Sequence, residues 1–237
     1  VINAFTQGTI PAVVLDTRFQ QVVWDEYLEV VERYNDPGNF TALIGYEWTS
    51  TENGNNLHRN VIYRDGPFRA SIMRPYTTAE SFNPEDLWTW MEQAEETTGQ
   101  KLLAIPHNGN LSNGLMFDEV RLSGEPFDVE YFKQRAKWEP IYEITQMKGD
   151  GEAHPMLSPD DEFADFETWD KGQLGPEPKT PEMLPREYAR AALRRGLGYE
   201  AETGTNPFKF GVIGSTDAHT SLSTVGEDNF FGKVAAV

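Results

Sequence analysis

Helical and strand-like patterns alternate along this chain, and this alternation limits its fold more than any other feature. Apolar residues at helical spacing, bounded by Pro, Asn and Gly, predict helices over residues 23–34, 84–99, 129–138 and 186–196. Short apolar runs predict strands over residues 41–46, 58–63, 101–106, 140–145 and 209–214. Because strands separated by helices pair in parallel through right-handed crossovers, we expect an α/β fold with a mainly parallel sheet.

The composition is that of a globular protein, and we expect residues 1–237 to form a single domain. Hydrophobic residues make up 38% and charged residues 24% of the 237 positions. Lys and Arg total 20 against 38 Asp and Glu, so the net charge of -18 repels nucleic acid and anionic membranes, and we expect neither as a partner. No apolar run reaches the roughly 18 to 20 residues of a membrane span, which predicts a soluble protein.

Two parts of the chain depart from this regular pattern. Residues 148–185 are rich in Asp, Glu, Pro and aromatic residues and are too long for an ordinary connection, so they are a lid or an insertion. We expect a lid, with His154 near the entrance of a site and Phe166 or Trp169 packed against the rim. Val1 is not an initiator methionine, and residues 230–237 resemble the start of a strand, so we expect a segment of a longer protein.

Polar side chains stand where predicted strands end. Glu47 follows the strand at 41–46, His107 follows the strand at 101–106, and Asp217 and His219 follow the strand at 209–214. Because the carboxyl ends of parallel strands meet on one face in barrel-like α/β enzymes, these side chains are expected to converge. Carboxylates and imidazoles are ligands of Zn²⁺, Mn²⁺ and Fe²⁺, so the pattern predicts a metal site.

Each of these residues has a simpler interpretation when taken alone. Asp217 can cap a turn, His107 can be a turn histidine bonded to a backbone carbonyl, and Glu47 can form a salt bridge with Arg59. The turn at residues 51–56 can bring His58 back beside Glu47, and three of the four histidines belong to this group. The joint pattern therefore favours the metal site.

Other chemistries lack their motifs. Without cysteine the chain has no disulfide, thiolate nucleophile or zinc-thiolate centre. The sequence contains no G-x-S-x-G elbow, P-loop, G-x-G-x-x-G or H-E-x-x-H motif. A triad of Ser215, Asp217 and His219 is disfavoured, because residues so close along an extended segment cannot relay a proton.

Four motifs, GYEWTS at 45–50, NLHRN at 56–60, IPHN at 105–108 and GSTDAH at 214–219, carry a family resemblance. In this order they resemble the PHP (polymerase and histidinol phosphatase) superfamily of metal-dependent hydrolases. The likeness is to the branch catalogued as domain of unknown function 3604, and it extends to residues 148–159, 161–170 and 206–220. The resemblance implies a distorted TIM-like (β/α) barrel that holds two or three divalent ions of Zn, Mn or Fe. The present chain would be an incomplete part of that barrel.

The resemblance also implies roles for individual residues. Glu47 would bridge two metals, His58 and His107 would bind the second, Asp217 the first and His219 the third. Glu47, Asp217 and His219 would be catalytic. The residues expected to orient substrate are Arg59, Gln146, Lys148 and His154. The family's opening H-x-H motif and its next histidine motif have no counterpart here, which leaves the first and third metal sites incomplete.

Together these observations predict a hydrolase that uses a metal-activated water on a small-molecule substrate. A phosphoester is the first expectation, because phosphate oxygens suit a multinuclear site, and an amide, lactam or carboxylic ester is the alternative. From another class, a non-catalytic metal- or ligand-binding domain fits the same residues. We expect a soluble protein of the bacterial cytoplasm or periplasm, and the sequence does not fix the compartment.

Overall fold

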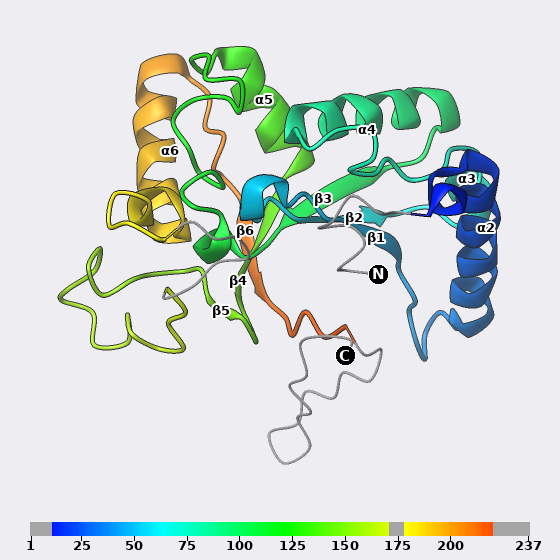
Figure 1. The fold of residues 1–237 in the computed structure, drawn as a ribbon, viewed down its shortest axis with the longest axis horizontal. Coiled ribbons are helices and arrows are strands. Elements are labelled where there is room, and N and C mark those ends of the chain that lie inside the picture. The colour runs from blue at the N-terminus through cyan, green and yellow to red at the C-terminus, as the bar shows by residue number, and fades with distance from the viewer. Residues whose placement is uncertain (1–10, 171–177, 220–237) are drawn as a thin grey trace. The chain divides into compact units, whose positions relative to one another are not determined.

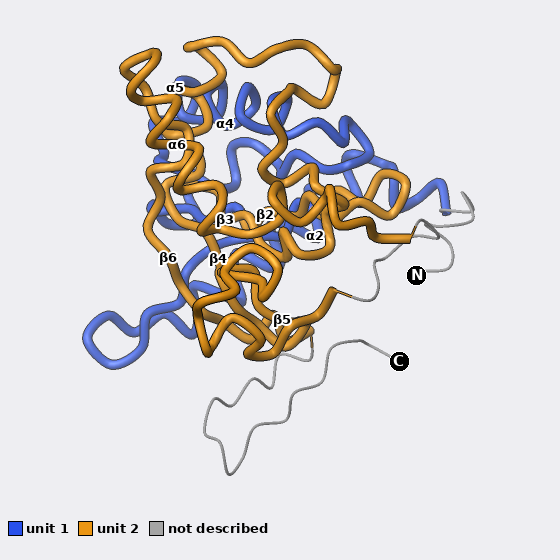
Figure 2. Tube along the Cα trace, turned by 90° about the vertical axis from the view of Figure 1, so that its left-hand side faces the viewer, with its two compact units in different colours: residues 1–48, 61–102 blue, residues 49–60, 103–237 orange. Residues whose placement is uncertain are grey.

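The computed structural model of the chain describes residues 11–170 and 178–219 (Figure 1). The chain divides into two compact units, one formed by residues 1–48 and 61–102 and the other by residues 49–60 and 103–237 (Figure 2). The prediction of a single domain is not decided by this division. None of the described helices is long and apolar enough to cross a membrane.

The predicted helices form, and their ends follow capping chemistry. The α-helices are α2 (Thr17–Tyr34), α3 (Pro67–Ala70), α4 (Pro84–Thr98), α5 (Val129–Trp138) and α6 (Ala189–Thr203). The short 3-10 helices are η1 (Ala12–Leu15), η2 (Glu52–Gly54), η3 (Gly109–Leu111) and η4 (Leu184–Arg186). The side chain of Asn83 accepts the Glu85 N–H at the start of α4, and Gly99 ends that helix in the left-handed region. Asp128 caps α5 through the Tyr131 N–H.

Helix α6 runs past its predicted end at Gly196 and stops at Gly204, which has φ +76°. A side chain at Gly196 would overlap the Asn206 side chain and crowd Phe208, so the glycine is needed for close packing inside the helix. The prediction of a helix stop at Gly196 was therefore wrong. The residue type was informative, but its role was packing instead of termination.

The strands form two small sheets instead of a barrel. The first sheet has the order β1-β2-β3, with β1 (Ile44–Trp48), β2 (Arg59–Tyr63) and β3 (Leu102–Pro106). The second has the order β5-β4-β6, with β4 (Ile141–Gln146), β5 (Gly149–Asp150) and β6 (Gly211–Gly214). No closed barrel exists within the described residues. The expected TIM-like barrel with mainly parallel strands was wrong, and the protein has a mixed α/β fold.

The second sheet shows why the pattern misled. Strands β4 and β6 are parallel with α6 between them in sequence, as the alternation predicts. However, the chain reverses directly after β4, and Gln146 pairs antiparallel with Gly149. Strand β5 has only two residues, which are too few to give a periodic pattern in the sequence. Periodicity predicts individual elements, whereas strand direction here depends on this tight reversal.

Each unit has its own core. In the first unit, Trp24, Tyr46, Tyr63 and Trp90 pack with ring centroids 5.5 to 6.3 Å apart, and Trp24 Nε1 donates to the Ala70 carbonyl. In the second unit the core cluster of buried residues is Leu57, Met116, Phe117, Tyr142, Ala189, Ala192 and Phe208. In this core the Tyr142 hydroxyl accepts the backbone N–H of Gly109 in η3, and Tyr142 lies in β4, which ends at the predicted site residue Gln146.

The segment 148–185 is irregular where it is described, with only β5 and η4 as regular elements. Phe166 and Trp169 are 64% and 45% exposed, so neither is buried against other side chains. Trp169 lies close to Gly149, whose φ of +96° and missing side chain permit that approach. The lid stays a prediction.

Candidate metal centre

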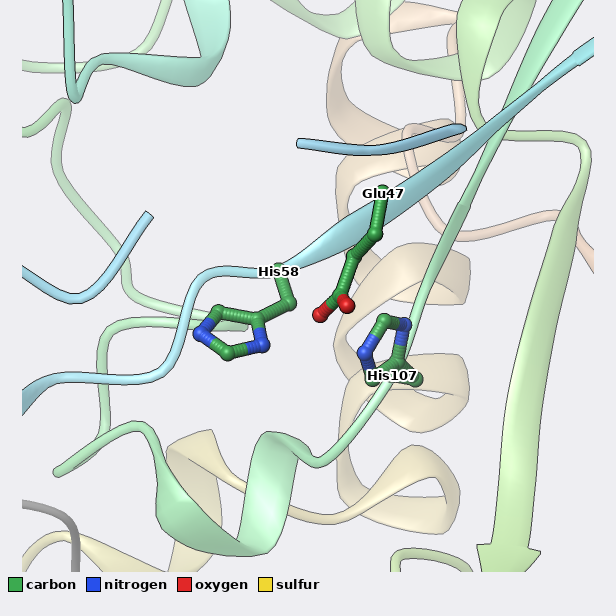
Figure 3. A group of neighbouring side chains, drawn as sticks. All are labelled: Glu47, His58 and His107. Carbon is green, nitrogen blue, oxygen red and sulfur yellow. The ribbon is translucent and has the colours of Figure 1, made fainter. Parts of the chain in front are cut away.

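Glu47, His58 and His107 form the one group of three or more side chains, among the described residues, that could hold a metal ion. Glu47 lies in β1, His58 directly precedes β2, and His107 directly follows β3. Each side chain offers a ligand atom, and the three atoms lie within 4.8 Å of one another (Figure 3). The neighbouring order of the three strands in their sheet brings these residues together.

Local contacts orient the two imidazoles. His58 Nε2 is 2.7 Å from the Thr51 hydroxyl, so Nδ1 is the nitrogen that could bind a metal ion together with Glu47 and His107. The His107 backbone N–H donates to the His58 carbonyl at 3.4 Å, and the rings are 5.6 Å apart at 82°. His107 is fully buried, and the left-handed φ of +52° at Asn108 turns the chain directly after it. Thr51 was not expected from the sequence, although a hydroxyl beside a ligand histidine commonly fixes its tautomer.

The donor set fits a transition-metal ion. One carboxylate and two imidazoles are borderline ligands that suit Zn²⁺, Mn²⁺ or Fe²⁺. Three protein ligands leave further coordination positions for water or substrate, which is the arrangement of catalytic sites. The atoms that would bind the ion are the Glu47 carboxylate oxygens, His58 Nδ1 and one nitrogen of His107.

Asp217 lies in a separate network of polar side chains in the second unit. Its Oδ2 accepts hydrogen bonds from Lys148 Nζ and, at 2.8 Å, from Gln146 Nε2. Its Oδ1 is 3.2 Å from Nε2 of His219, whose side chain is 44% exposed. Burial acts to raise the pKa of Asp217, but the Lys148 hydrogen bond and the charge of nearby His107 outweigh it, so the pKa is lowered.

Asn108 connects this network to the strand end that carries His107. The same Gln146 Nε2 that bonds Asp217 also donates to Asn108 Oδ1 at 2.9 Å. The side-chain oxygen Oε1 of Gln146 in turn accepts the Lys148 backbone N–H at 3.1 Å. The sequence interpretation missed Asn108, although an amide directly after a candidate ligand was a usable signal.

Arg59 lies in the core of the second unit instead of in a polar cavity. Its Nε is 2.9 Å from Glu139 Oε1, and Arg135 Nε is 3.3 Å from the other oxygen of Glu139. All three side chains are at most 4% exposed. A role for Arg59 in substrate binding stays a prediction, but the salt bridge that the sequence suggested between Arg59 and Glu47 is replaced by one to Glu139.

His154 is 3% exposed, so it does not stand at an open entrance. Its Nδ1 accepts the Met156 N–H at 3.1 Å, and its Nε2 donates to Asp170 at 2.9 Å. Both nitrogens are thus engaged inside the 148–170 segment. Nearby Asp150, which sequence analysis missed, is buried, and burial raises its pKa to about 6.

Comparison with known proteins identifies the family. The family described as "Protein of unknown function (DUF3604)" matches residues 2–237, and the chain belongs to it. No curated protein and no solved structure matches the chain. The predicted membership of this family is confirmed.

Proposed function

We propose that this DUF3604 protein is a metal-dependent hydrolase of the PHP type, with one divalent ion bound by Glu47, His58 and His107. The observation that carries the proposal is the convergence of one carboxylate and two imidazoles from three strand ends to within 4.8 Å. A divalent ion bound there would lower the pKa of a water molecule to near neutrality and polarise a substrate oxygen.

The surrounding residues have defined parts in this proposal. Thr51 holds the His58 ring so that Nδ1 faces Glu47 and His107. Fully buried His107 lies where water is scarce, which strengthens electrostatic interactions with a bound substrate.

The substrate proposed first is an anionic phosphoester of small size. The chain as a whole is strongly acidic, so an anion needs a local positive charge to approach it. Lys148, which is 8% exposed and ion-paired with Asp217, is the cation proposed for this role, and the substrate phosphate would compete with Asp217 for its ammonium. Lys148 and Gln146 are the residues proposed to orient the phosphoryl group.

A test uses a p-nitrophenyl phosphodiester and monoester as probes. Chelation should abolish hydrolysis, and Mn²⁺ or Zn²⁺ should restore it. Glu47→Gln should lower the rate by about 100-fold or more, because a metal ligand is lost, and should cost more than Lys148→Ala. The control is Glu52→Gln, an exposed glutamate in the neighbouring turn, which should leave the rate unchanged. Full activity of Glu47→Gln in a metal-free preparation would overturn the proposal.

A further inference from the structure

The buried ion pair between Lys148 and Asp217 is unusual because it involves a carboxylate that sequence analysis assigned to a metal. The two side chains are 11% and 10% exposed. An ammonium and a carboxylate so far removed from water are held together by strong attraction, since either one alone would be costly to bury.

Backbone hydrogen bonds hold Lys148 in place beside Asp217. Lys148 lies in the tight reversal between β4 and β5, where its N–H donates to the Gln146 side chain and its carbonyl accepts from Asn110 Nδ2 at 3.0 Å. Both peptide groups of the residue are therefore fixed. Within the described part of the chain, Asp217 is the acceptor that the ammonium reaches.

Asp217 is surrounded by donors. Lys148 and Gln146 donate to Oδ2, and His219 lies against Oδ1. The backbone at Asp217 has φ +50°, in the left-handed region. A divalent ion that approached this carboxylate would meet the positive charge of Lys148 at Oδ2, and two cations cannot share that oxygen without strong repulsion.

We propose that the Lys148 ammonium is an internal cation that competes with a divalent metal ion for Asp217. In the metal-poor chain Lys148 neutralises Asp217. A second ion binds to Asp217 only by displacing the lysine, and it does so with lower affinity than the ion at Glu47, His58 and His107. This inference rests on the proposed function, because it presumes that the chain binds a metal ion at Glu47, His58 and His107.

The experiment is a calorimetric Mn²⁺ titration of the chain and its variants. Lys148→Met keeps the length of the side chain and removes its charge, so it should strengthen the second binding event by 10-fold or more. The gain should vanish in Lys148→Met/Asp217→Asn. Lys148→Arg, which keeps the charge, should titrate as the unmodified chain does.

The matched control is Lys179→Met. Lys179 is another buried lysine of the same unit, 2.8 Å from the Glu187 carboxylate, with side chains 7% and 0% exposed. Its removal should leave the Mn²⁺ titration unchanged. An equal gain in Lys179→Met would show a general effect of lost positive charge and would overturn the proposal. Superimposable titrations of Lys148→Met and the unmodified chain would also overturn it.

Asp217→Asn as a single change provides a second test, which does not require Lys148→Met to fold. If Lys148 masks Asp217, this change should alter the first binding event by less than about 3-fold, a shift of under 0.7 kcal/mol in binding free energy. A loss of 10-fold or more would show that Asp217 binds metal unhindered and would refute the competition. Glu47→Gln distinguishes the two proposals. If this change did not weaken the first Mn²⁺ binding event, the metal centre at Glu47, His58 and His107 would be refuted.

Discussion

Removing the Glu139 carboxylate should destabilise the protein severely. The structure places this carboxylate between two buried guanidinium groups, with Arg59 Nε at 2.9 Å and Arg135 Nε at 3.3 Å. Breaking a buried ion pair by removing one partner costs about 3 to 5 kcal/mol. Glutamine can still accept one hydrogen bond, so we expect Glu139→Gln to lower the free energy of unfolding by about 3 kcal/mol. That is a large part of the roughly 5 to 15 kcal/mol by which domains are stable.

Urea denaturation followed by tryptophan fluorescence measures this change. The control is Glu130→Gln in α5, the helix that Glu139 directly follows; Glu130 is 4.0 Å from Lys133, and both side chains are at least 60% exposed. Exposed pairs contribute about 0 to 1 kcal/mol, so this variant should unfold nearly as the unmodified chain does. If Glu139→Gln also changed stability by less than about 1 kcal/mol, the buried ion pairs of Arg59, Arg135 and Glu139 would not be stabilising the fold.

Glu139→Gln should also affect the candidate metal centre. Arg59 follows His58, and its Nη1 donates to the Leu57 carbonyl at 2.5 Å, so the pair with Glu139 fixes the chain on both sides of that histidine. Glu139→Gln should therefore weaken metal binding by about 10-fold, the lower end of the effect of outer-shell changes. If Glu139→Gln bound metal with the affinity of the unmodified chain, the ion pairs of Glu139 would have no part in positioning His58.

Two further changes test packing and electrostatics by chemical denaturation. Gly196→Ala should lower the free energy of unfolding by about 1 to 3 kcal/mol, because the new methyl group overlaps Asn206. Gly198→Ala in the same helix meets nothing within 4 Å and should raise the free energy of unfolding by about 0.5 to 1 kcal/mol. Equal effects of the two changes would refute the role of Gly196 in packing. The pKa of Asp150 is raised to about 6 from 3.8, so the folded state binds its proton more tightly and stability falls as pH rises from about 4 through 6. Asp150→Asn should therefore raise the free energy of unfolding by about 1 kcal/mol at pH 8, after allowance for solvent screening, and should change it little at pH 4. An equal rise at both pH values would contradict the raised pKa of Asp150.

The helices and most strands could be predicted because their signals are local. The Asn83 cap and Gly99 stop of α4 stand in the sequence as plain boundary residues, and the structure has them in those roles. The two-residue strand β5 gave no periodic signal, and its antiparallel pairing with β4 overturned the expected parallel barrel. Chain reversal over two residues is set by contacts such as that between Gln146 and the Lys148 N–H, which no spacing rule reveals.

The candidate site was predictable in part for a similar reason. Glu47, His58 and His107 stand at strand ends, and strand pairing alone brings such positions together. Arg59 has the same polar character and lies beside His58, yet the structure buries it against Glu139, which is 80 residues away in the sequence. Long-range partners of this kind decide whether a charged residue faces a site or the core, and the sequence does not show them.

Zinc-edge X-ray absorption on the chain loaded with one equivalent of Zn²⁺ tests the metal centre most directly. The expected spectrum has imidazole scattering from two histidines together with oxygen ligands, in accord with the group Glu47, His58 and His107. In His58→Gln and in His107→Gln the imidazole contribution should fall by one ligand. A spectrum with oxygen ligands alone, unchanged in both variants, would contradict the proposed centre.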